Sequence, residues 1–347
     1  MKFDLRQTNI SKGVAVCLLL WHHLFFNNPS MYKHFISVLT FDGIPVESMI
    51  SDMCKVCVAI FLILSGYGLH KSYIRYLEKS SDKGIRFDLK FVRYRLLKLY
   101  IPFWTVFIIF VPLGLLFGRN YDKVYSSNPI NAVIDFFGLS YLFYGSNTNT
   151  ANAAWWYMSI IVVFFSVYPL LHRFVKYSAE VALSLSFLLS FLELPVREYA
   201  IWLMPFVFGI YISERDIFGR VTKILVTDFN RFLASLFLTV AFALIRNMTL
   251  NDIRFDFAFA TAIILFTFWC TSRIPLLNKA LEELGKKSGL IFFVHSFIYS
   301  MYFARYVYFF KYPVLIFLAL LIMSYLVSWM LQKMIDLTRL NKLGSMS

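Results

Sequence analysis

A lysine and a histidine in the first apolar stretch of the chain have the residue types and the spacing for acid–base chemistry. Lys12 and His23 are eleven residues apart, which on a helix is about three turns, or about 16 Å along the axis. Both side chains therefore project from nearly the same face, whereas His22 points well away from it. An imidazole transfers protons near neutral pH better than any other side chain. His23 could accept the proton of a hydroxyl while the hydroxyl oxygen attacks an activated carbonyl.

The space between these two residues would then be a slot for a long anionic ligand that enters at Lys12. An ionisable residue inside a bilayer is costly unless it pairs, lines a wet cavity or reaches the interface. The alternative interpretation is that both histidines lie among the outer headgroups. In that case the stem of Lys12 extends to the inner interface without binding anything.

A second basic group precedes the third apolar stretch. Arg95 and Lys98 are three residues apart, so on a helix they share a face and can hold phosphate groups together. Pro102 follows and predicts a break between an interfacial helix and the span proper. The alternative is ordinary positive charge at the inner surface that meets lipid headgroups.

Four further side chains are candidates for ligand contacts. Ser65 and Tyr67, which flank Gly66, could hydrogen-bond a ligand, although small residues in this stretch also favour close helix packing. Trp156 could stack on a sugar ring, or it could belong to an interfacial aromatic belt. His295 could line a ligand site, or it could only form a bond between helices.

The composition indicates the element that positions these residues, which is the membrane-spanning helix. Of the 347 residues, 59% are hydrophobic, 19% are aromatic and only 16% are charged, against about 25% charged in an average soluble domain. A single soluble core could not bury so much apolar surface. Apolar stretches of about 20 residues predict spans, and we place ten of them near 9–27, 52–74, 100–118, 154–173, 178–194, 199–213, 229–246, 254–271, 289–309 and 313–333.

Basic residues in short loops predict the orientation of the chain. The net charge of +14 is not gathered on a soluble module, so we expect no nucleic-acid partner. Nine lysines and arginines lie within 71–98, whereas few lie in 28–51 or 119–153. Both termini are therefore predicted to be cytoplasmic. We expect one transmembrane domain over 1–347 without a separate soluble domain, and a first helix that is retained. The pair Cys54 and Cys57 lacks further ligands, so helix packing is expected there, and no metal site.

Four blocks of the sequence resemble, in order, the acyltransferase-3 family of membrane O-acyltransferases. The first block is a basic residue followed by ten residues and a histidine, and the second is similar to Phe-Phe-Leu-Ser-Gly-Tyr. The third is Arg-x-x-Arg before a proline, and the fourth is Leu-Gly-Lys-x-Ser followed by histidine. In this chain the blocks are Lys12 with His23, residues 61–67, Arg95 with Lys98 and Pro102, and residues 284–295.

The resemblance implies a catalytic role for His23 and contacts from Lys12, Arg95 and Lys98 to the phosphates of coenzyme A. It also implies transfer of an acetyl group from acetyl-CoA to a hydroxyl of a carbohydrate at the outer face of a bacterial plasma membrane. The chain departs from the pattern where Lys12 and Lys98 replace arginines and where Asn9 replaces an acidic residue. Lysine is a point charge rather than a bidentate fork, so these changes affect donor binding more than reaction type.

The sequence therefore predicts an all-α, polytopic membrane O-acetyltransferase that modifies a cell-envelope or secreted polysaccharide or its lipid-linked precursor. Ser65 would contact the donor, and Tyr67, Trp156 and His295 the acceptor. Membrane lipid surrounds the protein, and the polysaccharide-synthesis machinery is an expected partner. A transporter of a sugar or lipid-linked sugar is the alternative, although the internal symmetry that such proteins often have is not evident. An inactive scaffold would tolerate loss of His23.

Overall fold

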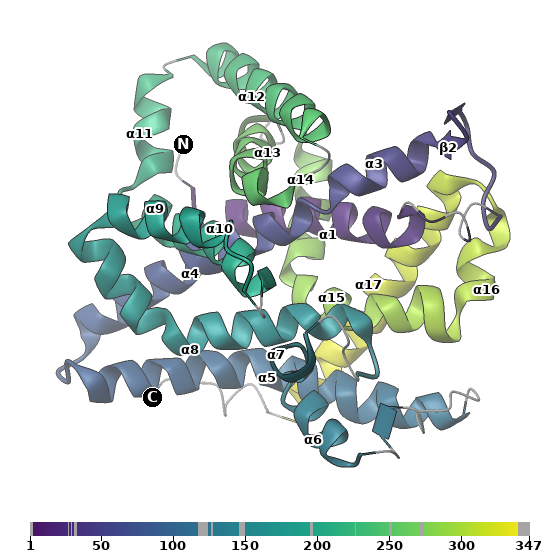
Figure 1. The fold of residues 1–347 in the computed structure, drawn as a ribbon, viewed down its shortest axis with the longest axis horizontal. Helices are drawn as coiled ribbons and strands as arrows, with labels where there is room; N and C mark the ends of the chain where they lie inside the picture. Colours follow the sequence, from purple (N-terminus) through teal and green to yellow (C-terminus); the bar gives the residue numbers. More distant parts are fainter. Residues whose placement is uncertain are drawn as a thin grey trace.

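The computed structural model describes residues 3–26, 28, 30, 33–116, 124–125, 128–145, 150–194, 197–225, 227–249, 252–270 and 274–338. Nearly all of these residues are helical (Figure 1). The exception is a short antiparallel hairpin, in which Thr40 pairs with Pro45 and Phe41 with Ile44. Its turn consists of Asp42 and Gly43, both with positive φ, as a two-residue hairpin turn requires.

The elements follow in chain order. The first half contains α1 (Leu5–Phe25), β1 (Thr40–Phe41), β2 (Ile44–Pro45), α3 (Val46–Cys54), α4 (Cys57–Lys79), α5 (Ile85–Leu116), α6 (Ile130–Phe136), α7 (Ser140–Tyr144), η2 (Ala153–Trp155) and α8 (Trp156–Tyr177). The second half contains α9 (Ala179–Leu189), α10 (Arg197–Glu214), α11 (Ile217–Ile224), α12 (Asp228–Met248), η3 (Ile253–Phe255), α13 (Asp256–Cys270), α14 (Pro275–Lys286), α15 (Ser288–Ser296), η5 (Phe297–Tyr302), α16 (Ala304–Val307), η6 (Tyr308–Phe310) and α17 (Pro313–Leu337).

Each of the ten predicted spans overlaps a helix, although 178–194 is helical only over Ala179–Leu189. The prediction of an all-α membrane protein is confirmed. Among the described residues, six helices are long and apolar enough to cross a membrane, within Val46–Lys79, Ile85–Gly114, Ala153–Tyr177, Asp228–Met248, Ile253–Cys270 and Pro313–Leu337. A seventh is Ser288–Tyr302 with Ala304–Phe310, which is bent by 91°. Helix α9 is too short to cross alone, at about 16 Å, and α1 and α10 carry polar ends. The count of ten and the orientation of the termini stay predictions.

The predicted break at Pro102 is wrong, because α5 continues through both Pro102 and Pro112. A proline removes one N–H donor but need not end a helix whose neighbouring turns are packed. Here Phe103 and Val106 are fully buried directly after Pro102, so packing maintains the helix across the missing bond.

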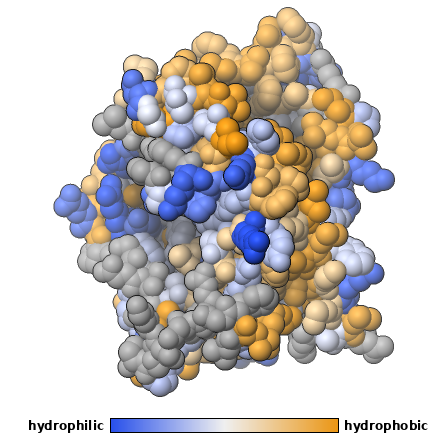
Figure 2. Space-filling view, turned by 90° about the vertical axis from the view of Figure 1, so that its right-hand side faces the viewer, coloured by the Kyte–Doolittle hydropathy of each residue, from blue (hydrophilic) through white to orange (hydrophobic). Residues whose placement is uncertain are grey.

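Large apolar side chains cover the outside of several helices. Phe237 and Met248 of α12 and Ile322 and Met330 of α17 are exposed. On the face shown in Figure 2, hydrophobic residues cover broad areas and hydrophilic residues gather in separate patches. Because a soluble monomer rarely exposes continuous apolar surface of this extent, the exposed faces of α12 and α17 fit contact with lipid.

Helix α1 lies in the middle of the molecule, in contact with α3, α4, α13, α14, α15 and α17 (Figure 1). Asp4 caps its first turn, because the Asp4 carboxylate accepts the backbone N–H of Gln7 at 3.0 Å. Glycines let its neighbours approach closely. A Cβ on Gly13 would overlap the carbonyl of Leu281 in α14, and a Cβ on Gly285 would overlap the carbonyl of Asn9. Backbone contact therefore fixes α1 against α14 near Lys12.

Candidate functional site: two cavities joined by the first helix

The first cavity, here called the basic cavity, has a volume of about 1240 Å³. It is lined at the start of α1 and by parts of α4, α5, α8 and α11. Among the described residues its walls hold seven cations and two carboxylates. The cations are Lys12, Lys71, Arg75, Arg95, Lys98, Lys223 and Arg231, and the carboxylates are Asp4 and Asp216.

The predicted donor residues meet in this cavity, since Lys12, Ser65, Arg95 and Lys98 all line it. The charges of Arg95 and Lys98 both repel that of Lys12, and the Nε of Arg95 is buried without a hydrogen-bond partner. The Arg95 guanidinium lies over the ring of Phe165, 5.8 Å from its centroid. Mutually repelling, partly desolvated cations are stabilised by an anionic ligand that pairs with them.

Tyr67 also lines the basic cavity. Its hydroxyl donates to the carbonyl of Phe3 at 3.2 Å, and its ring packs edge-on against that of Phe3. The structure therefore groups Tyr67 with the predicted donor residues, at a different cavity from Trp156. The two glycines beside Tyr67 differ in packing. A Cβ on Gly66 would overlap the backbone of Phe206 in α10, whereas Gly68 has open space beside it. Gly68 also lines the basic cavity.

The second cavity, here called the histidine cavity, has a volume of about 650 Å³. Its lining does not share a residue with the basic cavity among the described residues. It includes His22, His23, Asp52, Lys55, Asn152, Trp156, Arg246 and Tyr299. Helix α1 thus presents Lys12 to one cavity and His23 to the other, whereas the sequence predicts a single slot between the two residues.

His22 corrects the sequence analysis, because it lines the same cavity as His23. Its Nδ1 lies 2.8 Å from the carbonyl oxygen of Ser51, and the Ser51 hydroxyl donates to the backbone carbonyl of His22 at 3.0 Å. Since a carbonyl only accepts, Nδ1 carries the proton and Nε2 keeps its lone pair. The two rings differ in direction on α1, but the cavity is wide enough to reach both.

His295 lies directly behind His23 and is fully buried. The two ring centroids are 4.8 Å apart. His295 Nδ1 donates to the carbonyl of Phe292 at 2.7 Å, and its Nε2 lies 3.3 Å from the Ser296 hydroxyl. The structure thus places His295 against His23 but outside the lining of the cavity. Tyr299, on the π-helical turn η5, lines the cavity instead, with its hydroxyl 3.5 Å from His23 Nδ1.

Arg246 is a cavity residue that the sequence analysis did not single out. It is 2% exposed, its Nε lies 3.0 Å from Asp256 Oδ1, and its Nη1 donates to the carbonyl of Met53 at 2.5 Å. An ionisable residue near the end of an apolar helix is itself a signal of function. Its partner Asp256 begins the next long helix, α13, so the pair could have been proposed from the sequence.

Asp135 holds the segment that closes one side of the histidine cavity. This fully buried carboxylate accepts hydrogen bonds from Tyr125, Ser140, Thr150 and the backbone N–H of Ala151, at 2.7 to 3.0 Å. Burial raises the pKa of Asp135, and these donors oppose that rise. Asn152 follows at once and lines the cavity. Other parts of the predicted outer segment 119–153 lie outside the described residues.

The long apolar helices define a membrane protein, and its helix α1 carries residues that line two separate cavities. The sequence profile of the acyltransferase domain of the acyltransferase-3 family matches residues 7–333. The chain therefore belongs to the acyltransferase-3 family and is a membrane acyltransferase. A comparison with curated proteins and one with solved structures gave no significant match.

Proposed function

We propose that the protein transfers an acetyl group from acetyl-CoA to a hydroxyl of a cell-envelope or secreted polysaccharide, or of its lipid-linked precursor. One observation carries the proposal: the same helix presents Lys12 to a cavity with seven cations and two carboxylates, and His23 to a second cavity. The second cavity is lined by histidine, tryptophan and asparagine together with Asp52, Lys55 and Arg246. A polyanionic donor fits the first cavity and a neutral, hydroxyl-rich acceptor fits the second.

At the donor end, Lys12, Arg95 and Lys98 hold the phosphates of coenzyme A, and Ser65 adds a hydrogen bond. Charge-assisted bonds to phosphate are among the strongest in proteins. The extended arm of the coenzyme then follows α1 towards His23, over about 16 Å. By the positive-inside rule the basic cavity faces the cytoplasm of a bacterial cell, where acetyl-CoA is made.

At the acceptor end, His23 acts as the general base. It takes the hydroxyl proton while the hydroxyl oxygen attacks the thioester carbonyl, so that a C–O bond forms. The tetrahedral intermediate collapses with cleavage of the C–S bond, and the proton passes to the sulfur of coenzyme A. An acyl-enzyme intermediate would divide the same transfer into two steps. His295 and Tyr299 position the His23 ring, and Trp156 stacks on the sugar.

The decisive experiment supplies the purified, reconstituted protein with acetyl-labelled acetyl-CoA and envelope polysaccharide. Wild type transfers the label, and His23→Ala lowers kcat by about 100-fold or more, the usual contribution of a general base. His22→Ala is the matched control, with the neighbouring imidazole removed from the same cavity, and costs less than tenfold.

Other outcomes separate the rival functions. Full transfer by His23→Ala together with its loss in His22→Ala would assign the base to His22. Movement of a sugar across the vesicle membrane without transfer of label would instead support a transporter. A protein that binds polysaccharide synthases but neither transfers label nor moves sugar would be a scaffold.

A further inference from the structure

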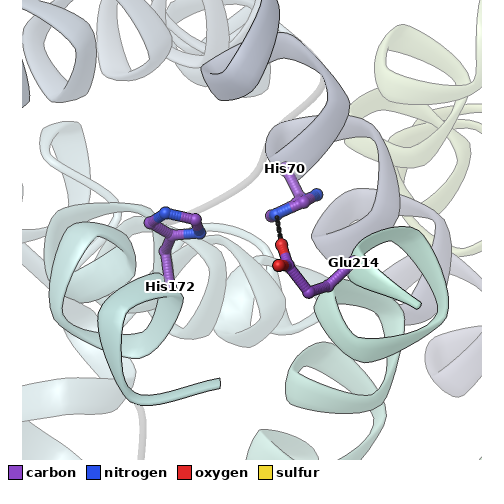
Figure 3. A group of neighbouring side chains, drawn as sticks. All are labelled: His70, His172 and Glu214. Carbon is purple, nitrogen blue, oxygen red and sulfur yellow. Dashed lines mark ion pairs between the residues drawn. The ribbon is translucent and has the colours of Figure 1, made fainter. Parts of the chain in front are cut away.

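Two histidines and a glutamate from three different helices meet next to the basic cavity. His70 belongs to α4, His172 to α8, and Glu214 is the last residue of α10. Both imidazoles are buried, and Glu214 is partly exposed. Figure 3 shows the three side chains converging from these helices, with the His70–Glu214 ion pair marked. None of the three lines either cavity, and the proposed reaction does not use them.

The donor atoms are close enough to share one ion. His70 Nε2 lies 2.8 Å from Glu214 Oε2, and one ligand atom from each residue lies within 4.8 Å of the other two. The His70 and His172 ring centroids are 5.2 Å apart. Four tetrahedral N and O ligands at about 2.0–2.2 Å from zinc are about 3.3 Å from one another. The three atoms are thus near that spacing, and Glu214, which ends its helix and is partly exposed, has room to adjust.

An unpartnered nitrogen points to a missing ligand. The Nδ1 of His172 is buried and has no hydrogen-bond partner among the described residues. Buried polar atoms nearly always have a hydrogen-bond partner. An unpartnered nitrogen of His172 beside a second imidazole and a carboxylate therefore indicates a ligand that accepts its lone pair, such as a metal ion. In Figure 3 a ring nitrogen of His172 faces the His70–Glu214 pair.

The other nitrogen of His70 is already supported. Its Nδ1 lies 2.8 Å from the Ser213 hydroxyl. A histidine that binds a metal usually donates its second ring N–H to such an acceptor, which fixes the tautomer. Without an ion, Nε2–H of His70 donates to the Glu214 carboxylate at 2.8 Å. With Nδ1–H directed at Ser213, loss of the Nε2 proton frees that lone pair for a metal ion, which then takes the place of the proton.

We propose that His70, His172 and Glu214 bind a divalent transition-metal ion of the zinc class. Two imidazoles and one carboxylate form a donor set that suits zinc. The ion ties α4 and α8 to the end of α10. This site lies beside the basic cavity, because Lys71 follows His70 directly and Asp216 lies two residues after Glu214, and both line that cavity. The proposal is independent of the proposed reaction, since metal binding is measured without any substrate.

The test begins with protein purified without chelator, whose metal content is measured by mass spectrometry. A chelated sample is then titrated with Zn²⁺, and with Co²⁺, whose visible absorption reports its ligands. We expect one ion per chain, a higher thermal unfolding temperature with Zn²⁺, and a Co²⁺ spectrum typical of nitrogen and oxygen ligation.

Variants locate the ion. His172→Gln and Glu214→Gln should lose binding, and Ser213→Ala, which removes only the support of His70, should weaken it by about 10- to 100-fold. His34→Gln, a histidine outside the cluster, should bind as wild type does. Retention of Zn²⁺ affinity by Glu214→Gln and Ser213→Ala, or a wild-type protein that binds neither ion, would overturn the proposal. In that case His70 and Glu214 form only a hydrogen-bonded pair.

Discussion

Arg95 is the clearest single residue on which to test donor binding, because a matched cation lies two positions away on α5. Arg95 lines the basic cavity, whereas Arg93 is exposed and does not. Loss of a charge-assisted hydrogen bond costs about 1.5–3 kcal/mol. Arg95→Ala should therefore raise the KM for acetyl-CoA by about 10- to 100-fold, with a smaller change in kcat.

Steady-state kinetics at varied donor concentration measure this effect. Arg93→Ala should leave the donor KM within about twofold, since a solvated surface charge contributes little. Equal effects of the two substitutions would show that general positive charge, rather than a phosphate site, accounts for donor binding.

At the residue scale, helical spacing predicts which side chains share a face but not which helices meet. Spacing and resemblance predict that Lys12, Arg95 and Lys98 act together, and the structure brings them to one cavity. Helical spacing predicts that His22 points away from His23, yet both line one cavity. The width of that cavity depends on several helices, so the spacing on α1 alone cannot predict it. Nothing local links His70, His172 and Glu214, whose proximity depends on how α4, α8 and α10 pack.

At the scale of elements, the contact between α1 and α14 depends on Gly285. A Cβ there would overlap the carbonyl of Asn9, whereas Gly289, four residues later, has open space beside it. Overpacking of a tight contact costs about 1–3 kcal/mol. Gly285→Ala should therefore lower the free energy of unfolding by about that amount and weaken donor binding, because Lys12 moves with α1.

Thermal unfolding in detergent and the donor KM test this expectation. Gly289→Ala is the control and should be neutral or slightly stabilising, since alanine favours helix over glycine by up to about 1 kcal/mol. If both variants unfold at the wild-type temperature, the backbone contact between α1 and α14 is looser than described.

Asp135 allows a second test at the same scale, at the other cavity. Asp135→Asn keeps the size of the side chain but removes one of its two acceptor oxygens. In the wild-type protein, four donors share these two oxygens. Each buried donor without a partner costs about 1–3 kcal/mol. The segment before Asn152 should loosen, so the KM for the acceptor should rise several-fold while the KM for acetyl-CoA stays unchanged.

Kinetics with each substrate varied in turn distinguish these effects. Asp82→Asn, an exposed change in the loop between α4 and α5, should alter neither constant. A rise in the donor KM alone after Asp135→Asn would contradict the assignment of this segment to the acceptor side.

At the scale of the whole molecule, hydropathy predicts the helical membrane fold, and each predicted span overlaps a helix. It could not predict that α9 is too short to cross or that the helix pair from Ser288 to Phe310 bends by 91°. These features depend on neighbouring helices that satisfy the backbone where a span is broken. The polar residues Lys12, His22 and His23 of α1 line cavities, which composition alone does not reveal.

The backbone contacts at Gly13 and Gly285 hold α1 in a fixed position against α14. Lys12 and His23 lie on this one helix, so the fold fixes the distance between them. In the proposed function, that distance separates the phosphates of the donor from its thioester. A shortened donor cannot be compensated by movement of the helix. Under the proposed function, the enzyme would select its thioester by reach, and the length of the donor would be a specificity determinant without a dedicated pocket.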